Sequence, residues 1–136
     1  YSKHGNNFVK SMIRLASEKK AIRVVNDQFG TPTSAVDLAS LIMEILPDIF
    51  SPGVEIYHYS NEGSTSWFEF SKEIFLQLGF KYSVQPVSTS DYGEAVERPT
   101  TTVLNKRKIK ESFEINIPYW KVSLRTFIKE LKQTKR

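Results

Sequence analysis

Helix-like and strand-like segments alternate along this chain of 136 residues, and that alternation constrains its fold more than any other feature. In the helix-like segments, apolar residues recur every three or four positions with polar residues between them. The strand-like segments are short and rich in Ile and Val. Helices that alternate with short strands are typical of α/β domains. We therefore expect a single mixed α/β domain over residues 1–136, with a small sheet and amphipathic helices.

The expected elements follow from these patterns and from local start and stop signals. Ser66 with Glu69 three residues later is the strongest helix start, and Gly79 supplies the stop of that helix. Ser34 caps another helix, which should stop at Pro47. Further helices are expected over residues 7–20 and 105–113 and from about residue 118 onward, strands over residues 21–25, 54–59 and 82–87, and an irregular segment with one helical turn over residues 88–98.

The apolar faces of the helices predict which side chains form the core. On the helix that follows Ser34, the residues expected to be buried are Ala35, Leu38, Ala39, Ile42, Ile45 and Leu46. On the helix that follows Ser66 they are Trp67, Phe70, Ile74 and Leu78, and on the closing helix they are Trp120, Leu124, Phe127, Ile128 and Leu131.

The composition excludes several classes of protein. The chain contains no cysteine, so it has neither a disulfide framework nor a cysteine-based zinc site, and it fits a reducing, cytoplasmic location. Its apolar stretches are far shorter than the roughly 18 residues that indicate a membrane span. We therefore expect no membrane partner.

Well-known cofactor motifs are missing from the sequence. No two of the six glycines are two positions apart, so there is no Gly-x-Gly turn, and there is no Gly-Lys-Ser/Thr sequence either. None of the six tyrosines is followed four residues later by lysine, so the Tyr-x-x-x-Lys pair of short-chain reductases is absent. His4 and His58 lack partners at metal-ligand spacing. We expect no catalytic residue, no metal site and no cofactor on this chain.

The C-terminal part of the chain is basic. Residues 106–136 contain ten Lys or Arg and three Glu, a local net charge of +7. Such a patch can bind the phosphates of a nucleic acid, or it can be the solvated face of amphipathic helices. The second interpretation is favoured because no nucleic-acid recognition motif accompanies the charge, although one basic residue could meet a diphosphate. We therefore expect no nucleic-acid partner.

Two loops carry groups suited to ligand binding. Residues 28–33 combine amide, hydroxyl and aromatic groups in one connection between a strand and a helix, including Gln28 and Thr31. Arg98 stands before a proline in an irregular segment, where its guanidinium could hold a phosphate in a fork. A capped turn and a surface salt bridge are the alternative interpretations of these loops.

At these loops the sequence resembles the C-terminal half of the dTDP-4-dehydrorhamnose reductase family. The residues that carry the resemblance, in order, are Gly5-Asn6-Asn7-Phe8-Val9-Lys10, Val25 to Thr33 with Asp37-Leu38-Ala39, Tyr57-His58, Gly63, Ser66-Trp67-Phe68-Glu69-Phe70, Arg98-Pro99 with Val103-Leu104-Asn105, and Trp120 with Leu124. They cover essentially the whole chain. One small departure is Asn105, where the family usually has Asp.

The family belongs to the extended short-chain dehydrogenases, so the resemblance implies an N-terminal Rossmann domain that carries the NADPH-binding glycines and the catalytic Tyr-x-x-x-Lys. The chain starts at Tyr1 rather than at methionine, and Tyr1 resembles the tyrosine of the strand after the catalytic helix, not the catalytic tyrosine. We therefore expect this chain to be the C-terminal, substrate-binding portion of the enzyme, with the Rossmann domain outside it.

By the same resemblance, the parent enzyme would reduce dTDP-4-dehydro-L-rhamnose to dTDP-L-rhamnose with NADPH, for polysaccharide biosynthesis. The dTDP-sugar would be bound by residues of this portion. The resemblance implies this role for Asn7, Phe8, Gln28, Thr31 and Arg98.

Two alternatives remain open at this point. One is another nucleotide-sugar reductase or epimerase of the same superfamily. The other is a non-enzymatic relative, such as the regulatory beta subunit of methionine adenosyltransferase, in which the same fold serves as an interaction module. An intact upstream Tyr-x-x-x-Lys would favour the enzyme. The sequence leaves the oligomeric state open, with a homodimer as one candidate.

Overall fold

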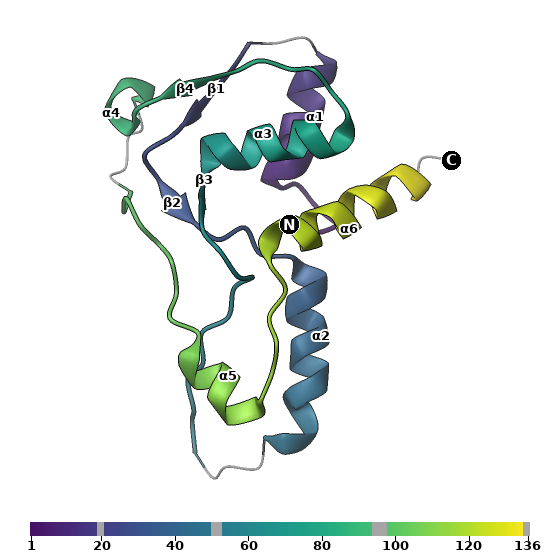
Figure 1. Cartoon of the computed structure of the whole chain (residues 1–136), viewed down its shortest axis with the longest axis vertical. Coiled ribbons are helices and arrows are strands. Elements are labelled where there is room, and N and C mark those ends of the chain that lie inside the picture. Colours follow the sequence, from purple (N-terminus) through teal and green to yellow (C-terminus); the bar gives the residue numbers. More distant parts are fainter. Residues whose placement is uncertain (19–20, 50–52, 94–97, 135–136) are drawn as a thin grey trace.

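The computed structural model describes residues 1–18, 21–49, 53–93 and 98–134, and its strands form two separate pairs (Figure 1). Strand β1 (Ile22–Val25) runs parallel to β4 (Val84–Val87), and β2 (Phe29–Gly30) runs antiparallel to β3 (Thr65–Ser66). The helices are α1 (Phe8–Ser17), α2 (Ala35–Ile45), α3 (Trp67–Leu78), α4 (Thr89–Tyr92), α5 (Arg107–Phe113) and α6 (Trp120–Thr134), with a 3-10 turn at Leu46–Asp48. The expected mixed α/β fold is confirmed, but the small sheet is divided.

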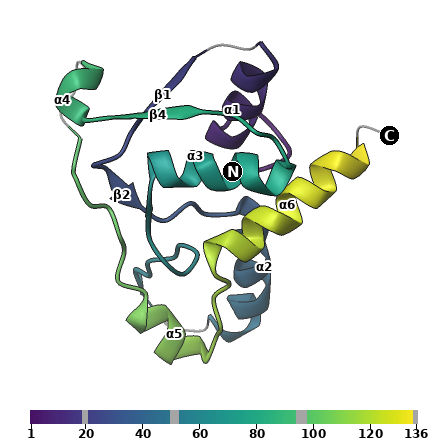
Figure 2. The same cartoon turned by 45° about the horizontal axis from the view of Figure 1, so that its top comes forward.

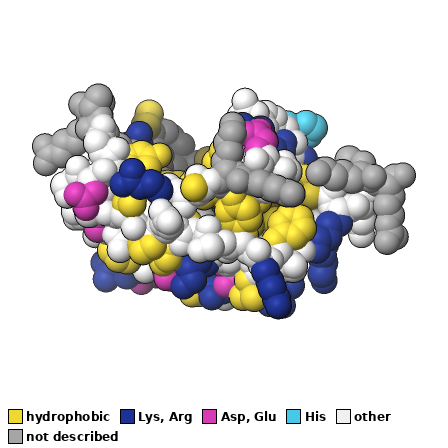
Figure 3. All heavy atoms as spheres, turned by 90° about the horizontal axis from the view of Figure 1, so that it is seen from above, with side chains coloured by type: hydrophobic (Ala, Val, Ile, Leu, Met, Phe, Trp, Pro, Cys, Tyr) yellow, Lys and Arg dark blue, Asp and Glu magenta, His cyan; other side chains and the backbone are white. Residues whose placement is uncertain are grey.

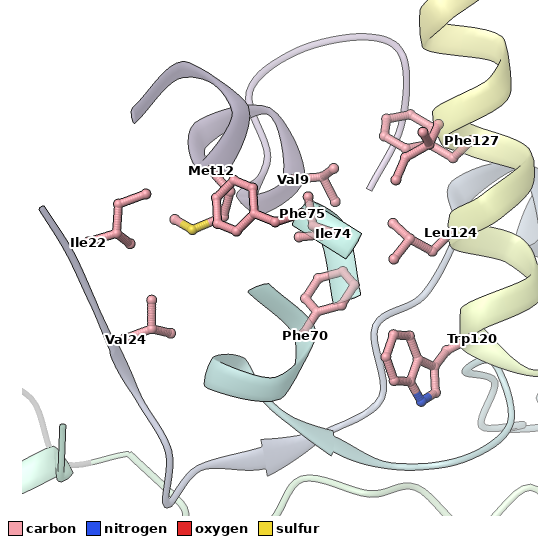
Figure 4. Packing of buried hydrophobic residues seen from close by; sticks show 11 residues of the cluster. Val9, Met12, Ile22, Val24, Phe70, Ile74, Phe75, Trp120, Leu124 and Phe127 are labelled. Atoms are coloured by element: carbon pink, nitrogen blue, oxygen red, sulfur yellow. The ribbon is translucent and has the colours of Figure 1, made fainter. Parts of the chain in front are cut away.

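The larger hydrophobic core lies between α1, α3, α6 and β1, and we call it the first core. Figure 4 shows its side chains pointing toward one another from these four elements. Phe70, Ile74 and Leu124 lie at its centre with at most 1% of their surface exposed. Its buried members are Val9, Met12, Ile22, Val24, Phe70, Ile74, Phe75, Trp120, Leu124, Phe127 and Ile128.

A second, smaller core lies between α2, α5 and the segment that leads into α6, and the turned view in Figure 2 shows these elements together. Its buried members are Leu41, Ile45, Ile109, Ile115 and Ile117. Tyr57, Tyr59 and Phe113 pack against them from the edge. The molecule therefore has two regions, one built on each core. In the view of Figure 1, the region of the first core lies above the region of the second.

A buried polar side chain connects the two regions. Asn61 has no exposed surface, and its Oδ1 accepts a hydrogen bond from the backbone N–H of Ser34 at 2.8 Å. Its Nδ2 lies 2.6 Å from Asp37 Oδ2 in α2 and 3.0 Å from Ser123 Oγ in α6. The buried Lys106 donates to the backbone oxygen of Asn61 at 2.8 Å. Because buried polar groups need partners, these bonds fix the start of α2 relative to α6.

The local start and stop signals are confirmed. Ser66 caps α3 by accepting from the backbone N–H of Glu69 at 3.2 Å, and Gly79 ends that helix with a φ of 77°. Glycine suits this place because a left-handed backbone costs it little. Ser34 caps α2, which ends at Ile45, just before the turn that contains Pro47.

Residues 54–59 do not form the strand that their alternation predicted. Tyr57 and Tyr59 face the second core, whereas Val54 and Ile56 are 93% and 71% exposed. The alternation is therefore real, but among the described residues this segment has no ladder partner, since no strand is paired with it.

Other boundaries shift by a few residues. The strand expected over residues 82–87 is limited to Val84–Val87, and the helix expected over residues 105–113 starts at Arg107. The first helix ends at Ser17, while residues 19–20 of its predicted range lie outside the described residues. The expected helical turn in residues 88–98 is α4, and residues 94–97 lie outside the description.

The prediction of the buried face of α2 is wrong for five of its six residues. Only Ile45 is buried, whereas Ala35 and Ala39 are exposed and Leu38, Ile42 and Leu46 are 37%, 49% and 56% exposed. Leu41, which the prediction did not include, is buried instead. The second core is too narrow to cover more than one side of this helix.

Within the described part of the chain, no helix has the length and apolar character needed to cross a membrane.

The core predictions for α3 and α6 are mostly confirmed. Leu78 and Leu131 are partly buried against the first core, at its edge. Trp67 is the exception, since 41% of its surface is exposed. Its place in the first turn of α3 puts it beyond the end of the core, where it becomes part of a pocket.

Candidate functional site

A pocket of about 470 Å³ lies beside β1, between α1 and the start of α3. Its polar and aromatic lining consists of Phe8, Arg23, Gln28, Trp67, Tyr92 and Arg98. Apolar side chains of α1 and β1 complete the wall. Two guanidinium groups beside three aromatic rings and one amide suit a ligand that has a planar ring and a negative charge.

The aromatic wall is fixed by the first core. Phe8 is the first residue of α1, and its ring lies 4.8 Å from that of Trp67, the first residue of α3. Phe8 also stacks on the buried Phe70 with ring centres 5.5 Å apart and an angle of 16°. The exposed part of the Trp67 indole is open to solvent or ligand. The core thus holds rigid rings at the pocket.

Gln28 reaches the pocket from the loop after β1, although only 5% of its surface is exposed. Its Nε2 donates to Thr89 Oγ1 at 3.1 Å. Asp27 in turn accepts from the Thr89 hydroxyl at 2.7 Å and from the Thr89 backbone N–H at 2.9 Å. The Thr89 hydroxyl and backbone N–H lower the pKa of the Asp27 carboxyl, because both hydrogen bonds favour its charged form.

The positive charge of the pocket comes from two different elements. Arg23 belongs to β1 and points outward between the buried Ile22 and Val24, with Nη2 3.4 Å from the backbone oxygen of Asp91. Arg98 lies on the segment after α4 and is exposed. Figure 3, which views the molecule from above, shows Lys and Arg side chains around exposed hydrophobic ones. A guanidinium can form two parallel hydrogen bonds to a phosphate, which an ammonium cannot.

The structure brings together three of the five predicted site residues. Phe8, Gln28 and Arg98 line the same pocket, although they come from widely separated parts of the sequence. Their common location agrees with a shared task, and ligand binding by each of them stays a prediction.

The other two predicted site residues lie outside the pocket lining. Asn7 caps α1, accepting from the Lys10 backbone N–H at 3.2 Å. Thr31 donates to the backbone oxygen of Gly63 at 2.7 Å. Both side chains therefore have local structural partners, and their contact with a ligand also stays a prediction.

Sequence reasoning missed three of the six polar and aromatic lining residues. The helical pattern assigns Trp67 to the core, and Tyr92 lies in a segment predicted to be irregular. Arg23 carries a sequence signal that could have found it, because a lone arginine stands between apolar residues in a strand of four residues. Such a residue faces away from the core by the two-residue period of a strand.

The described residues do not fit a dinucleotide cofactor or a metal. At the start of α1, α2 and α3 a side-chain cap (Asn7, Ser34 or Ser66) already accepts from one N–H of the first turn and stands where a pyrophosphate oxygen would bind. The sequence also lacks a Gly-x-Gly turn. No group of three or more His, Asp or Glu side chains in the described part of the chain is placed to hold a metal ion.

Several basic residues of the C-terminal part pair with carboxylates. Lys108 lies 2.6 Å from Glu55, Lys110 lies 2.6 Å from Glu62, and Lys121 lies 2.9 Å from a carboxylate oxygen of α3. These pairs support the interpretation of the charge as a solvated helix surface.

Comparison with known proteins gives consistent matches over the whole chain. A sequence model described as the RmlD substrate binding domain matches residues 1–133. The spore coat polysaccharide biosynthesis protein SpsK of Bacillus subtilis is 38% identical, in a match that covers 96% of this chain and 44% of that protein. A dTDP-4-dehydrorhamnose reductase of Sinorhizobium fredii is 35% identical, over 94% of this chain and 46% of the reductase.

The fold agrees with a solved structure. The crystal structure of dTDP-4-dehydrorhamnose reductase from Bacillus anthracis, in complex with NADP, superposes with a TM-score of 0.89 and is 41% identical. The match covers 96% of this chain and 45% of that chain. The chain thus spans about half the length of the curated relatives that it matches.

Proposed function

Because this chain belongs to the RmlD substrate binding domain family, we propose that it is the substrate-binding portion of an NADPH-dependent reductase that converts dTDP-4-dehydro-L-rhamnose to dTDP-L-rhamnose. The observation that carries the proposal is the pocket in which Phe8, Gln28 and Arg98 meet. Its aromatic and cationic lining matches the two constant parts of a dTDP-sugar, the base and the diphosphate.

The rings and the guanidinium groups then have separate chemical tasks. The rings of Phe8 and Trp67 provide apolar surface for the thymine ring. The guanidinium groups of Arg98 and Arg23 provide charge-assisted hydrogen bonds to the diphosphate, each stronger than a bond between neutral groups.

Asn7 and Thr31 support the site from its margins. Asn7 caps the helix that begins with Phe8, and Thr31 ties the loop after Gln28 to the backbone of Gly63. Both contacts hold a lining residue in place, and we propose that these two side chains also border the bound dTDP-sugar.

This portion contributes to catalysis by binding. Contacts to the nucleotide and the diphosphate are remote from the reacting ketone, and their binding energy can hold the sugar in the orientation for reduction. The catalytic Tyr-x-x-x-Lys and the NADPH site are proposed to lie in a Rossmann domain outside residues 1–136. We further propose a cytoplasmic location, which the absence of cysteine supports, and a homodimeric assembly.

A chimera tests this function. Residues 1–133 would replace the matching segment of the Bacillus anthracis reductase, and NADPH oxidation would be followed with dTDP-4-dehydro-L-rhamnose. We expect turnover by the chimera and none by this chain alone. A chimera that folds and binds NADPH but turns over no dTDP-sugar would contradict the proposal and favour a regulatory relative. Turnover by the isolated chain would contradict the placement of the catalytic groups outside it.

A further inference from the structure

Gln28 belongs to a chain of hydrogen bonds that runs from the loop after β1 to the start of α4. The chain consists of the Asp27 carboxylate, the Thr89 hydroxyl and the Gln28 amide, with distances of 2.7 Å and 3.1 Å. We propose that Asp27 and Thr89 are positioning residues that hold the Gln28 amide with its oxygen toward the pocket, as an acceptor for an O–H or N–H group of the ligand. The inference rests on the proposed function of this pocket as a dTDP-sugar site.

The direction of the hydrogen bonds follows from the chemistry of the three groups. An ionised carboxylate only accepts, so the Thr89 hydroxyl must donate its single hydrogen to Asp27. The same hydroxyl then has only lone pairs left for Gln28 and must accept. The side of the amide that meets Thr89 is therefore the NH2 group, and the amide oxygen is turned to the other side.

Burial makes this orientation difficult to change. Gln28 is 5% exposed, and Thr89 is half-buried, so water cannot freely replace the bond between them. Within the described part of the chain, no residue donates a hydrogen bond to the Gln28 amide oxygen, while Gln28 itself lines the pocket. An acceptor that faces the pocket favours a ligand with a matching O–H or N–H donor, because a ligand without that donor forgoes the hydrogen bond.

The positioning role of the Thr89 side chain can be tested separately from the structural role of the Thr89 backbone. Its N–H donates to Asp27 at 2.9 Å, and this bond does not depend on the side chain. Thr89→Val therefore removes the hydroxyl while it keeps the shape of the side chain and the attachment of α4. Thr89→Ser keeps the hydroxyl. Thr126→Val on the exposed face of α6 is a matched control, since it removes a hydroxyl outside the pocket.

The test is calorimetry with dTDP-L-rhamnose and with dTDP. It compares the unaltered chain with Thr89→Val, Thr89→Ser, Gln28→Leu, Thr126→Val and the double variant that combines Thr89→Val with Gln28→Leu. A thermal melt of each variant shows whether it is folded. Thr89→Ala replaces Thr89→Val in both the single and the double variant if the valine side chain prevents folding.

We expect Thr89→Val and Gln28→Leu each to weaken the binding of dTDP-L-rhamnose about tenfold. The double substitution should be no worse than Gln28→Leu alone, because both single changes act through the same amide. Thr89→Ser and Thr126→Val should bind within about twofold of the unaltered chain. If the tenfold loss persists with dTDP, the donor lies on the nucleotide; if it appears only with dTDP-L-rhamnose, the donor lies on the sugar.

Two results would overturn the inference. One is unchanged affinity in Thr89→Val while Gln28→Leu loses affinity. The other is an additive loss in the double variant, which would mean that Thr89 acts on the ligand independently of Gln28. Failure of the proposed function looks different, since the unaltered chain itself would then bind neither dTDP nor dTDP-L-rhamnose.

Discussion

The two cores of this molecule are held together in different ways. The first core contains aromatic side chains of α3 and α6 in close contact, and its edge forms the wall of the pocket. The second core has five buried aliphatic side chains, and one side of α2 remains open, with Met43 68% exposed. Its position depends on the polar contacts of Asn61 and Lys106. The candidate site is therefore built on the densely packed region, whereas the other region depends on a few specific hydrogen bonds.

The largest effect is expected in the first core. Phe70→Ala should lower the free energy of unfolding by about 3–5 kcal/mol, because it leaves a cavity among closely packed rings. It should also weaken binding of dTDP-L-rhamnose, since Phe8 and Trp67 rest on the Phe70 ring. Denaturant unfolding and calorimetry measure the two effects.

Ile109→Ala in the second core is the matched comparison. This side chain is 3% exposed, and its truncation should cost about 2–5 kcal/mol. The affinity of the Ile109→Ala variant for dTDP-L-rhamnose should equal that of the unaltered chain under conditions where the variant is folded. An equal loss of affinity in both variants would break the distinction between the two regions.

A somewhat smaller effect is expected at the junction between the regions. Asn61→Leu should cost about 2–3 kcal/mol, because it leaves the Ser34 backbone N–H without its acceptor and the Asp37 carboxylate without one of its donors. Hydrogen exchange should accelerate in α2 and α5 more than in α3. Uniform acceleration in all helices would argue against Asn61 as a specific connection.

Arg98→Ala should affect binding and leave folding nearly intact. The loss of charge-assisted bonds to a diphosphate should weaken the binding of dTDP-L-rhamnose roughly ten- to hundredfold. In the chimera, KM should rise by a similar factor while kcat changes little, if the bonds are equal in the ground and transition states.

The control for that change is Arg125→Ala, on the exposed face of α6 and outside the pocket lining. Both variants should melt close to the unaltered chain, because exposed ion pairs contribute less than about 1 kcal/mol. An unchanged KM together with a normal melt for Arg98→Ala would remove Arg98 from the site.

The smallest effect depends on pH. Hydrogen bonds from Lys110 and Lys106 lower the pKa of the Glu62 carboxyl, so its charged form stabilises the fold. This contribution is present above the ordinary glutamate pKa and is lost as the pH falls through the lowered one. Solvent screens the partly exposed pairs, so Glu62→Gln should cost only about 1 kcal/mol near neutral pH, and the difference should shrink toward about pH 3. A difference that stays constant with pH would exclude the ion pairs as its cause.

Structural features that depend only on neighbouring residues could be predicted from the sequence. The cap at Ser66 and the stop at Gly79 depend on residues within one helix, and both are confirmed. The family resemblance carried by the ordered motifs is confirmed as well, because it depends on many short segments at once. The strand predicted over residues 54–59 is wrong, because a strand also needs a neighbouring strand to pair with. The sequence of the segment itself does not specify that neighbour.

The site and the junction depend on distant partners. Asn61 bonds to side chains 24 and 62 residues away, so its burial could not be read from its neighbours in the sequence. Thr89 and Gln28 are 61 residues apart, and only the pairing of β1 with β4 brings them together. Phe8, Gln28 and Arg98 were predicted as site residues from the resemblance, but their common pocket emerges only from the fold.

Calorimetry of the unaltered chain with two ligands tests most directly whether it binds the substrate and not the cofactor. The chain should bind dTDP-L-rhamnose saturably, through the pocket between β1, α1 and α3. It should not bind NADPH tightly, because it has no Gly-x-Gly turn and a side-chain cap already stands at the start of α1, α2 and α3. Micromolar affinity for NADPH, or no binding of the dTDP-sugar at millimolar concentration, would contradict the role of this chain as the substrate-binding portion.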